Sequence, residues 1–125
     1  MGIYLKYSPA DLIHDLNTFG LFFENMAVRD LGINASYLDG SVKRYRDSSG
    51  LECDAVLHLR NGQWAAIEIK LGGEKPIEGG AASLNKLKKT VNEDGLVFQM
   101  ILTASGPAYR KADGIYVVPI NCLTV

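Results

Sequence analysis

The chain has 125 residues, 47% of them apolar and 22% charged, which excludes disorder as its main state and is typical of one folded domain with one core. Thirteen basic and fourteen acidic residues give a net charge of -1, which argues against a protein that coats nucleic acid by bulk charge. We find no apolar run of membrane-spanning length, no secretory leader and no zinc spacing around the two cysteines, and so expect a reduced, cytoplasmic protein that does not enter a membrane.

Two helices are predicted before the first strand. Ser8, Pro9 and Asp11 supply a cap, a first-turn proline and a first-turn acid, so a helix should begin here and end near Gly20. A second helix is predicted over residues 21–31, with its apolar side chains on one broad arc.

Three strands follow, over residues 42–46, 51–59 and 63–71. In the second of these, strict alternation places Cys53 with Ala55 on one face and Asp54 with Val56 on the other. The buried register also indicates that Cys53 acts as a small apolar side chain rather than as a reactive thiol.

The rest of the chain predicts a helix over residues 81–91, a fully buried strand over 96–102 and a short strand over 115–118. An antiparallel three-strand meander followed by a helical crossover gives a mixed β-sheet flanked by helices. We therefore predict an α/β (α+β) fold in a single domain that spans residues 1–125.

The turn between the two central strands decides whether their acids meet. A two-residue loop at Asn61-Gly62 would pair Asp54 with Ile69 and put Asp54 and Glu68 on opposite faces. A three-residue loop that includes Arg60 would pair Asp54 with Glu68. We favour the longer loop because the apolar residues of the two strands then share a face.

In that register Lys70 shares the face of the two acids and lies opposite Glu52. Like charges directly opposite each other destabilise a bare sheet, so Asp54 and Glu68 beside an amine make sense if a divalent cation lies between them. Glu24 falls inside the apolar arc of the second helix and would find a partner at such a site. The alternatives are an ordinary cross-strand charge ladder, and a Glu24 that is partly exposed at a helix edge.

Basic and aromatic side chains give weaker signals. Trp64 is expected to serve packing, and Tyr45 is expected to be half buried. The only plausible group for contacting a nucleic-acid backbone consists of Lys43, Arg44, Arg46 and Lys86.

A helical Glu24, a strand Asp54 and Glu68-Ile69-Lys70 on the next strand resemble the signature of the PD-(D/E)XK, restriction-endonuclease-like superfamily. The wider text around these residues, from about Ser8 to Leu123, looks like one branch of it, the uncharacterised C-terminal domain of bacterial and archaeal AAA-type ATPases. The stretches that carry this likeness include Gly20-Leu21-Phe22-Phe23-Glu24-Asn25, Gly50-Leu51-Glu52-Cys53-Asp54-Ala55 and Ala66-Ile67-Glu68-Ile69-Lys70-Leu71-Gly72.

The resemblance implies a restriction-endonuclease-like core and a site for Mg or Mn held by Asp54, Glu68 and the backbone carbonyl of Ile69, with Glu24 as a further ligand. Lys70 would orient the attacking water, and the substrate would be a phosphodiester bond in DNA or RNA. The alternative is a catalytically silent regulatory or interaction module of an AAA-type ATPase. The resemblance also implies an N-terminal ATPase domain in cis. This chain has no P-loop motif and so no ATP site of its own, which fits either the C-terminal part of a larger ATPase or a stand-alone relic of one.

Overall fold

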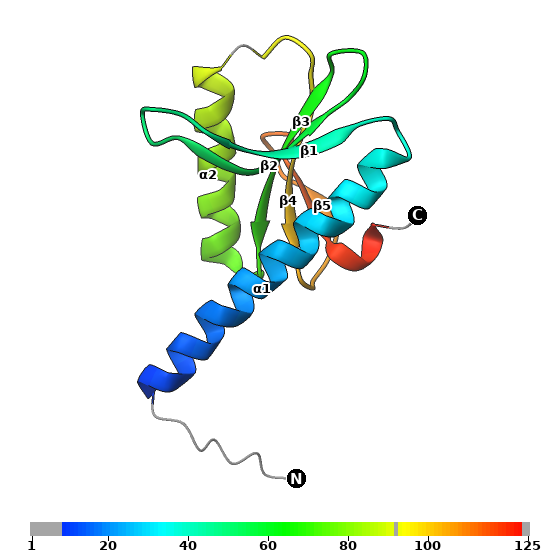
Figure 1. Cartoon of the computed structure of the whole chain (residues 1–125). Helices are drawn as coiled ribbons and strands as arrows, with labels where there is room; N and C mark the ends of the chain where they lie inside the picture. Colours follow the sequence, from blue (N-terminus) through cyan, green and yellow to red (C-terminus); the bar gives the residue numbers. More distant parts are fainter. Residues whose placement is uncertain (1–8, 92, 124–125) are drawn as a thin grey trace.

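The computed structural model describes residues 9–91 and 93–123, with side chains from Gly20 onward (Figure 1). One six-stranded mixed sheet lies between two helices, as the α/β prediction requires. The elements are α1 (Pro9–Ser36), β1 (Ser41–Arg46), β2 (Glu52–His58), β3 (Trp64–Lys70), α2 (Glu74–Thr90), β4 (Leu96–Thr103), β5 (Tyr109–Arg110), β6 (Tyr116–Pro119) and the short 3-10 helix η1 (Ile120–Cys122). In the part of the chain so described, no helix is both long and apolar enough to cross a membrane.

The strand order in the sheet is β1-β2-β3-β4-β6-β5. β1, β2 and β3 form the predicted antiparallel meander, and α2 carries the chain across to β4, which runs parallel to β3. β6 adds to β4 in parallel, and β5 closes that edge in antiparallel orientation. The crossover brings the C-terminal ends of β3 and β4 to the same end of the sheet, next to the start of α2.

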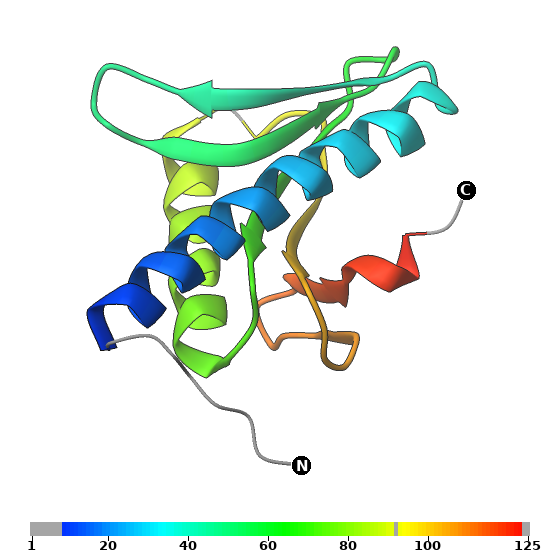
Figure 2. The same ribbon diagram turned by 60° about the horizontal axis from the view of Figure 1, so that its bottom comes forward.

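Each face of the sheet packs on one helix (Figures 1 and 2). On one face, α1 buries Phe23 and Ala27 against Ile67 and Leu102. On the other, α2 packs on strand residues that include Ala66. All of these side chains are at most 3% exposed, so the sheet is covered on both sides by apolar contacts.

Two predicted helix boundaries are wrong. α1 runs without a break through Gly20, where two helices were expected to meet, and the predicted cap Ser8 lies outside the described residues. A helical glycine costs only about 1 kcal/mol, which the packing of one long apolar face outweighs. α2 begins at Glu74, well before residue 81, because Pro76 lies in the first turn, where no intrahelical hydrogen bond is lost.

The three-residue loop between β2 and β3 is confirmed. The Leu59 amide donates to the Gln63 carbonyl at 2.8 Å, and Gly62 has a φ of 84°, as this turn requires. The ladder pairs Val56 with Ala66 and His58 with Trp64, the register that favours a meeting of the acids.

A β-bulge in β2 breaks the predicted alternation. Lys43 and Tyr45 of β1 pair with Val56 and Cys53 of β2, so three steps along β2 face two steps along β1. Cys53 and Val56 therefore both pack toward α2, while Ala55 packs toward α1. The prediction that Cys53 shares a face with Ala55 is wrong. The bulge lies between Cys53 and Val56, so it includes Asp54 and changes the direction of its side chain.

Candidate functional site

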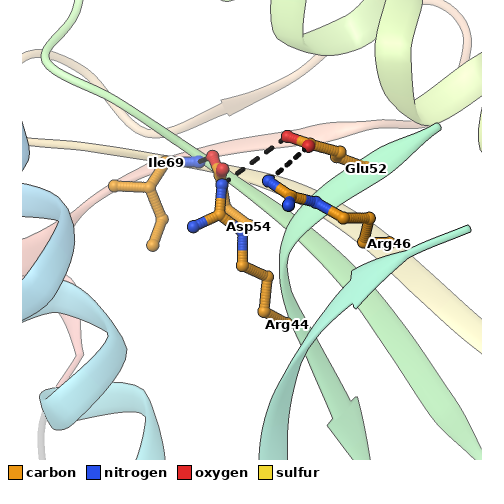
Figure 3. Close-up of polar contacts among 5 residues, drawn as sticks. All are labelled: Arg44, Arg46, Glu52, Asp54 and Ile69. Atoms are coloured by element: carbon orange, nitrogen blue, oxygen red, sulfur yellow. Dashed lines mark hydrogen bonds and ion pairs between the residues drawn. The ribbon is translucent and has the colours of Figure 1, made fainter. Parts of the chain in front are cut away.

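Asp54 occupies the gap where β2 leaves β3. The paired ladder between the two strands ends at Ala55 and Ile67, one residue before Asp54 would face Glu68. Instead, the Ile69 amide donates a hydrogen bond of 2.8 Å to the Asp54 Oδ2 atom (Figure 3). The bulge thus places the Asp54 carboxylate between the strands, with one oxygen fixed by the backbone.

Glu68 is the buried acid of the site, with only 6% of its surface exposed. It shares a strand face with Ala66 and Lys70, the face that packs on α2. Burial raises the pKa of Glu68 to about 9, and a hydrogen bond to Asp54 and the charge of Asp54 act in the same direction against the opposing Lys70. Burial therefore favours the protonated form of Glu68 at neutral pH.

Glu24 reaches Asp54 from α1. Partial burial is the largest cause of its raised pKa, followed by the charge of Asp54, to which it is also hydrogen-bonded; Arg44 and Lys70 act to lower it. The apolar arc of the helix does direct this acid toward the strand acids, as its position predicts. Three carboxylates and one amine thus interact electrostatically around Asp54.

Two details of the predicted arrangement are wrong. Glu52 does not face Lys70. It forms an ion pair with Arg46 at 2.7 Å and a longer one with Arg44 at 3.6 Å (Figure 3). Asp54 is not paired with Glu68 in the ladder either, because the β2–β3 pairing ends at Ala55 and Ile67, and Glu24 reaches Asp54 from the opposite face of the sheet to Glu68. Asp54 joins the two acids because its bulge sets it in the gap between the strands, within reach of both.

Lys70 lies against the glycine-containing part of α2. A Cβ atom placed at Gly80 would be 3.5 Å from the Lys70 Cε atom, so the helix leaves just enough room for the lysine stem.

Cys53, 1% exposed, donates to the Ile67 and Ala55 carbonyls at 3.4 Å, and burial raises the pKa of its thiol to about 11. The interpretation of Cys53 as a small buried side chain is confirmed.

Thr103 is a polar neighbour of Lys70 that sequence reasoning missed. It pairs with Lys70 across the parallel ladder of β3 and β4 and is 1% exposed. Among the described residues its hydroxyl has no hydrogen-bond partner, which is unusual for a buried polar group. From the sequence, Thr103 is only a threonine at the end of an apolar run, since the register of a parallel pair joined by a helix is not encoded locally.

Asp54 and Glu68 could supply two carboxylate ligands to a divalent cation, and the described residues supply no larger set. Within residues 9–91 and 93–123, no group of three or more His, Cys, Asp and Glu side chains is placed to hold a metal ion. Mg²⁺ is commonly bound by one or two carboxylates, with water and substrate phosphates completing its shell, and Asp54 with Glu68 is a donor set of that type. Ile69 contributes its amide to Asp54, and a role for its carbonyl stays a prediction.

The predicted basic group is divided between elements. Arg44 and Arg46 pair with Glu52 on the surface of the β1–β2 hairpin, whereas Lys86 is an exposed residue of α2. Two hollows are lined by residues other than Glu24, Asp54, Glu68 and Lys70. One of about 600 Å³ has mixed charges and adjoins β4 and β6, and one of about 290 Å³ lies between the β1–β2–β3 meander and α2.

The comparisons with known proteins give a family without a function. Searches of curated proteins and of solved structures returned no match. One family profile, described as a domain of unknown function (DUF4143), matches residues 19–123, a range that includes every residue of the acidic site. Domains of this family are commonly found next to AAA ATPase domains. The chain belongs to the DUF4143 family.

Proposed function

We propose that this domain is a metal-dependent nuclease of the PD-(D/E)XK type, which hydrolyses phosphodiester bonds in nucleic acid. The observation that supports this most is the meeting of Asp54, Glu68 and Lys70 where β2 leaves β3, with Glu24 beside them. A buried acid with a pKa near 9 is costly for a fold to keep, and such groups are concentrated at functional sites.

Each residue has a role that follows from its place. Asp54 and Glu68 would hold Mg or Mn, which when bound supplies a more acidic water and stabilises charge on the phosphoryl oxygens. Lys70, held by α2 at the same edge of the sheet, would donate a hydrogen bond to the attacking water and orient it. Glu24, only partly buried, would accept a hydrogen bond from a second water of the site.

The direct test is cleavage of labelled single-stranded DNA, duplex DNA and RNA in the presence of Mn²⁺. We expect at least one substrate to be cut, and Asp54→Asn and Lys70→Met to slow that cleavage by about a hundredfold or more, as loss of a positioned catalytic group does. Glu52→Gln is the matched control, since this acid belongs to a surface ion pair. Equal cleavage by all four proteins would contradict the proposal, as would no cleavage of any substrate.

One observation favours a second function, that of a regulatory or interaction module of an AAA-type ATPase in cis. α1 and the turn after it expose large apolar side chains: Phe22 is 67% exposed, Ile33 48% and Tyr37 72%. Such residues commonly mark contact surfaces. In a longer, cytoplasmic protein that contains the ATPase domain, Tyr37→Ser would alter ATP turnover while Asp54→Asn would not.

A further inference from the structure

The smaller hollow has an apolar floor and lies on the same sheet face as the acidic site. It has a volume of about 290 Å³, and Val56, Leu87 and Val91 are among the residues that line it. Val56 and Leu87 are at most 6% exposed, so they form its floor. Val56 is two residues along β2 from Asp54, and His58 and Trp64 lie farther along the strands, so the hollow begins near the gap that holds the carboxylates and extends toward the C-terminal end of α2.

Two aromatic rings line the hollow, and the polar end of each is already bonded elsewhere. The Trp64 indole nitrogen donates to the Asp94 carbonyl at 3.0 Å, and the Tyr45 hydroxyl donates to Asp47 at 3.1 Å. Both rings also pack against the apolar cluster beneath α2. The rings are therefore held in fixed orientations, and what they present to a ligand is apolar aromatic surface.

The exposed lining residues of the hollow are cationic or basic. Lys43, Arg44 and His58 are exposed, with Arg44 in an ion pair with Glu52, and none of the residues that line the hollow in the described part of the chain is acidic. The larger hollow differs, since Glu93 and Asp113 line it together with cations. A ligand that suits the smaller hollow is thus flat, largely apolar and attached to a negative charge.

We propose that this hollow binds one nucleobase of a nucleic-acid strand, with the neighbouring phosphate at Lys43. A base stacks on Trp or Tyr rings whatever its sequence, and the cations at the mouth match the backbone charge. The proposal rests on the proposed nuclease function, because the hollow would then fix one nucleotide of the strand beside the Asp54 gap. It also gives Trp64 and Tyr45 a role beyond the packing that their sequence context suggests.

Trp64 is the single tryptophan of the chain, so its fluorescence reports on this hollow alone. The experiment titrates the full chain, in EDTA to prevent cleavage, with a single-stranded oligonucleotide and with an abasic oligonucleotide of the same length and charge. We expect saturable quenching by the first, little quenching by the second, and an affinity about 5- to 100-fold weaker for the abasic strand. A free mononucleotide, as a third arm, distinguishes a site for small nucleotides from one for strands.

Two substitutions localise the effect. Val91→Phe fills the hollow from its half-buried edge and should reduce the affinity for the normal strand to that for the abasic strand. Val97→Phe is the control, since Val97 is 44% exposed and lines the other hollow. Equal affinity for both oligonucleotides without quenching would overturn the base site, as would an unchanged Val91→Phe variant.

Failure of this proposal can be told apart from failure of the proposed function, because binding is measured in EDTA and metal binding is measured separately. If Mn²⁺ stabilises the protein through Asp54 but no quenching occurs, the nuclease site stands and the base site falls. If quenching occurs without any response to Mn²⁺, the base site stands in a protein that is not a nuclease.

Discussion

At the scale of single residues, Glu68 is the group on which the site depends most. The residue is 6% exposed, and its burial and the neighbouring Asp54 raise its pKa far above the ordinary value of 4.5. A group of this kind lowers the free energy of unfolding at neutral pH, because the unfolded chain can release the proton and the folded chain cannot.

Glu68→Gln should therefore stabilise the domain at neutral and alkaline pH. Between pH 4.5 and pH 9 the folded parent holds a proton that the unfolded parent has lost, so its stability falls as pH rises through this window. The loss between pH 5 and pH 8 should be about 4 kcal/mol at about 1.4 kcal/mol per pH unit, and Glu68→Gln should remove it.

Urea denaturation at several pH values without divalent ions measures this difference. Glu52→Gln is the control, because Glu52 is 42% exposed and paired on the surface, and this variant should keep the pH slope of the parent. A parent whose stability is flat across the window would show that Glu68 is ionised like an ordinary acid.

Thr103→Val tests the hydroxyl beside Lys70. Valine has nearly the same shape, and removing a buried hydroxyl without a partner should leave stability unchanged or raise it by about 1 kcal/mol. If the hydroxyl serves the proposed site, the same variant should weaken binding of a phosphodiester oligonucleotide in EDTA. A loss of more than about 1 kcal/mol in urea denaturation would mean that the hydroxyl is bonded in the protein after all.

At the scale of elements, the β2–β3 hairpin could be predicted from the sequence and the bulge in β2 could not. The hairpin register was predictable, because Asn61-Gly62 marks a turn and only the longer loop aligns the apolar residues of both strands. The bulge at Asp54 was not, since an added residue leaves the hydrophobic pattern on each side of it intact. Alternation across 51–59 therefore predicted one face for residues that the structure divides between two.

The same contrast holds for the helices and the last strands. The continuity of α1 through Gly20 depends on its long-range contacts with the sheet, which outweigh a local glycine signal. β5, at Tyr109–Arg110, lies where the sequence analysis predicts no strand, because two exposed residues carry no strand pattern and pair only through the ladder with β6. The candidate acids could be identified from the sequence, whereas Thr103 and the aromatic hollow depend on contacts between distant segments.

Gly62→Ala should destabilise the domain by about 1 kcal/mol, because Gly62 has a φ of 84°, where a Cβ atom is strained. No atom lies within 4 Å of the added Cβ, so the effect is one of backbone conformation alone. Gly79→Ala is a control of opposite sign: this glycine is helical and equally open, so alanine should add about 0.5–1 kcal/mol. Equal changes in urea denaturation for the two variants would contradict the assigned turn.

At the scale of the whole molecule, the site gathers residues from both sides of the sheet. α1 brings Glu24 to one face, β3 presents Glu68 and Lys70 to the other, and Asp54 lies in the gap between β2 and β3. The base site that we propose adjoins the same gap on the α2 face. This arrangement suits a nucleic-acid strand that crosses the β1–β2 hairpin, which carries Lys43, Arg44 and Arg46.

The central claim is that Asp54 and Glu68 bind a divalent cation, and thermal melting with and without millimolar Mn²⁺ tests it most directly. A ligand that binds only the folded state adds about 2.7 kcal/mol at a hundredfold excess over its Kd, on the order of 5–15 °C for a domain of this size. In Asp54→Asn the side-chain oxygen can still accept the hydrogen bond from the Ile69 amide, so the variant should fold. Asp54→Asn should lose most of the stabilisation by Mn²⁺, while Glu52→Gln keeps it. Without metal, Asp54→Asn should melt no lower than the parent, because one of the crowded charges is gone. Equal responses of the parent and Asp54→Asn to Mn²⁺ would contradict the claim.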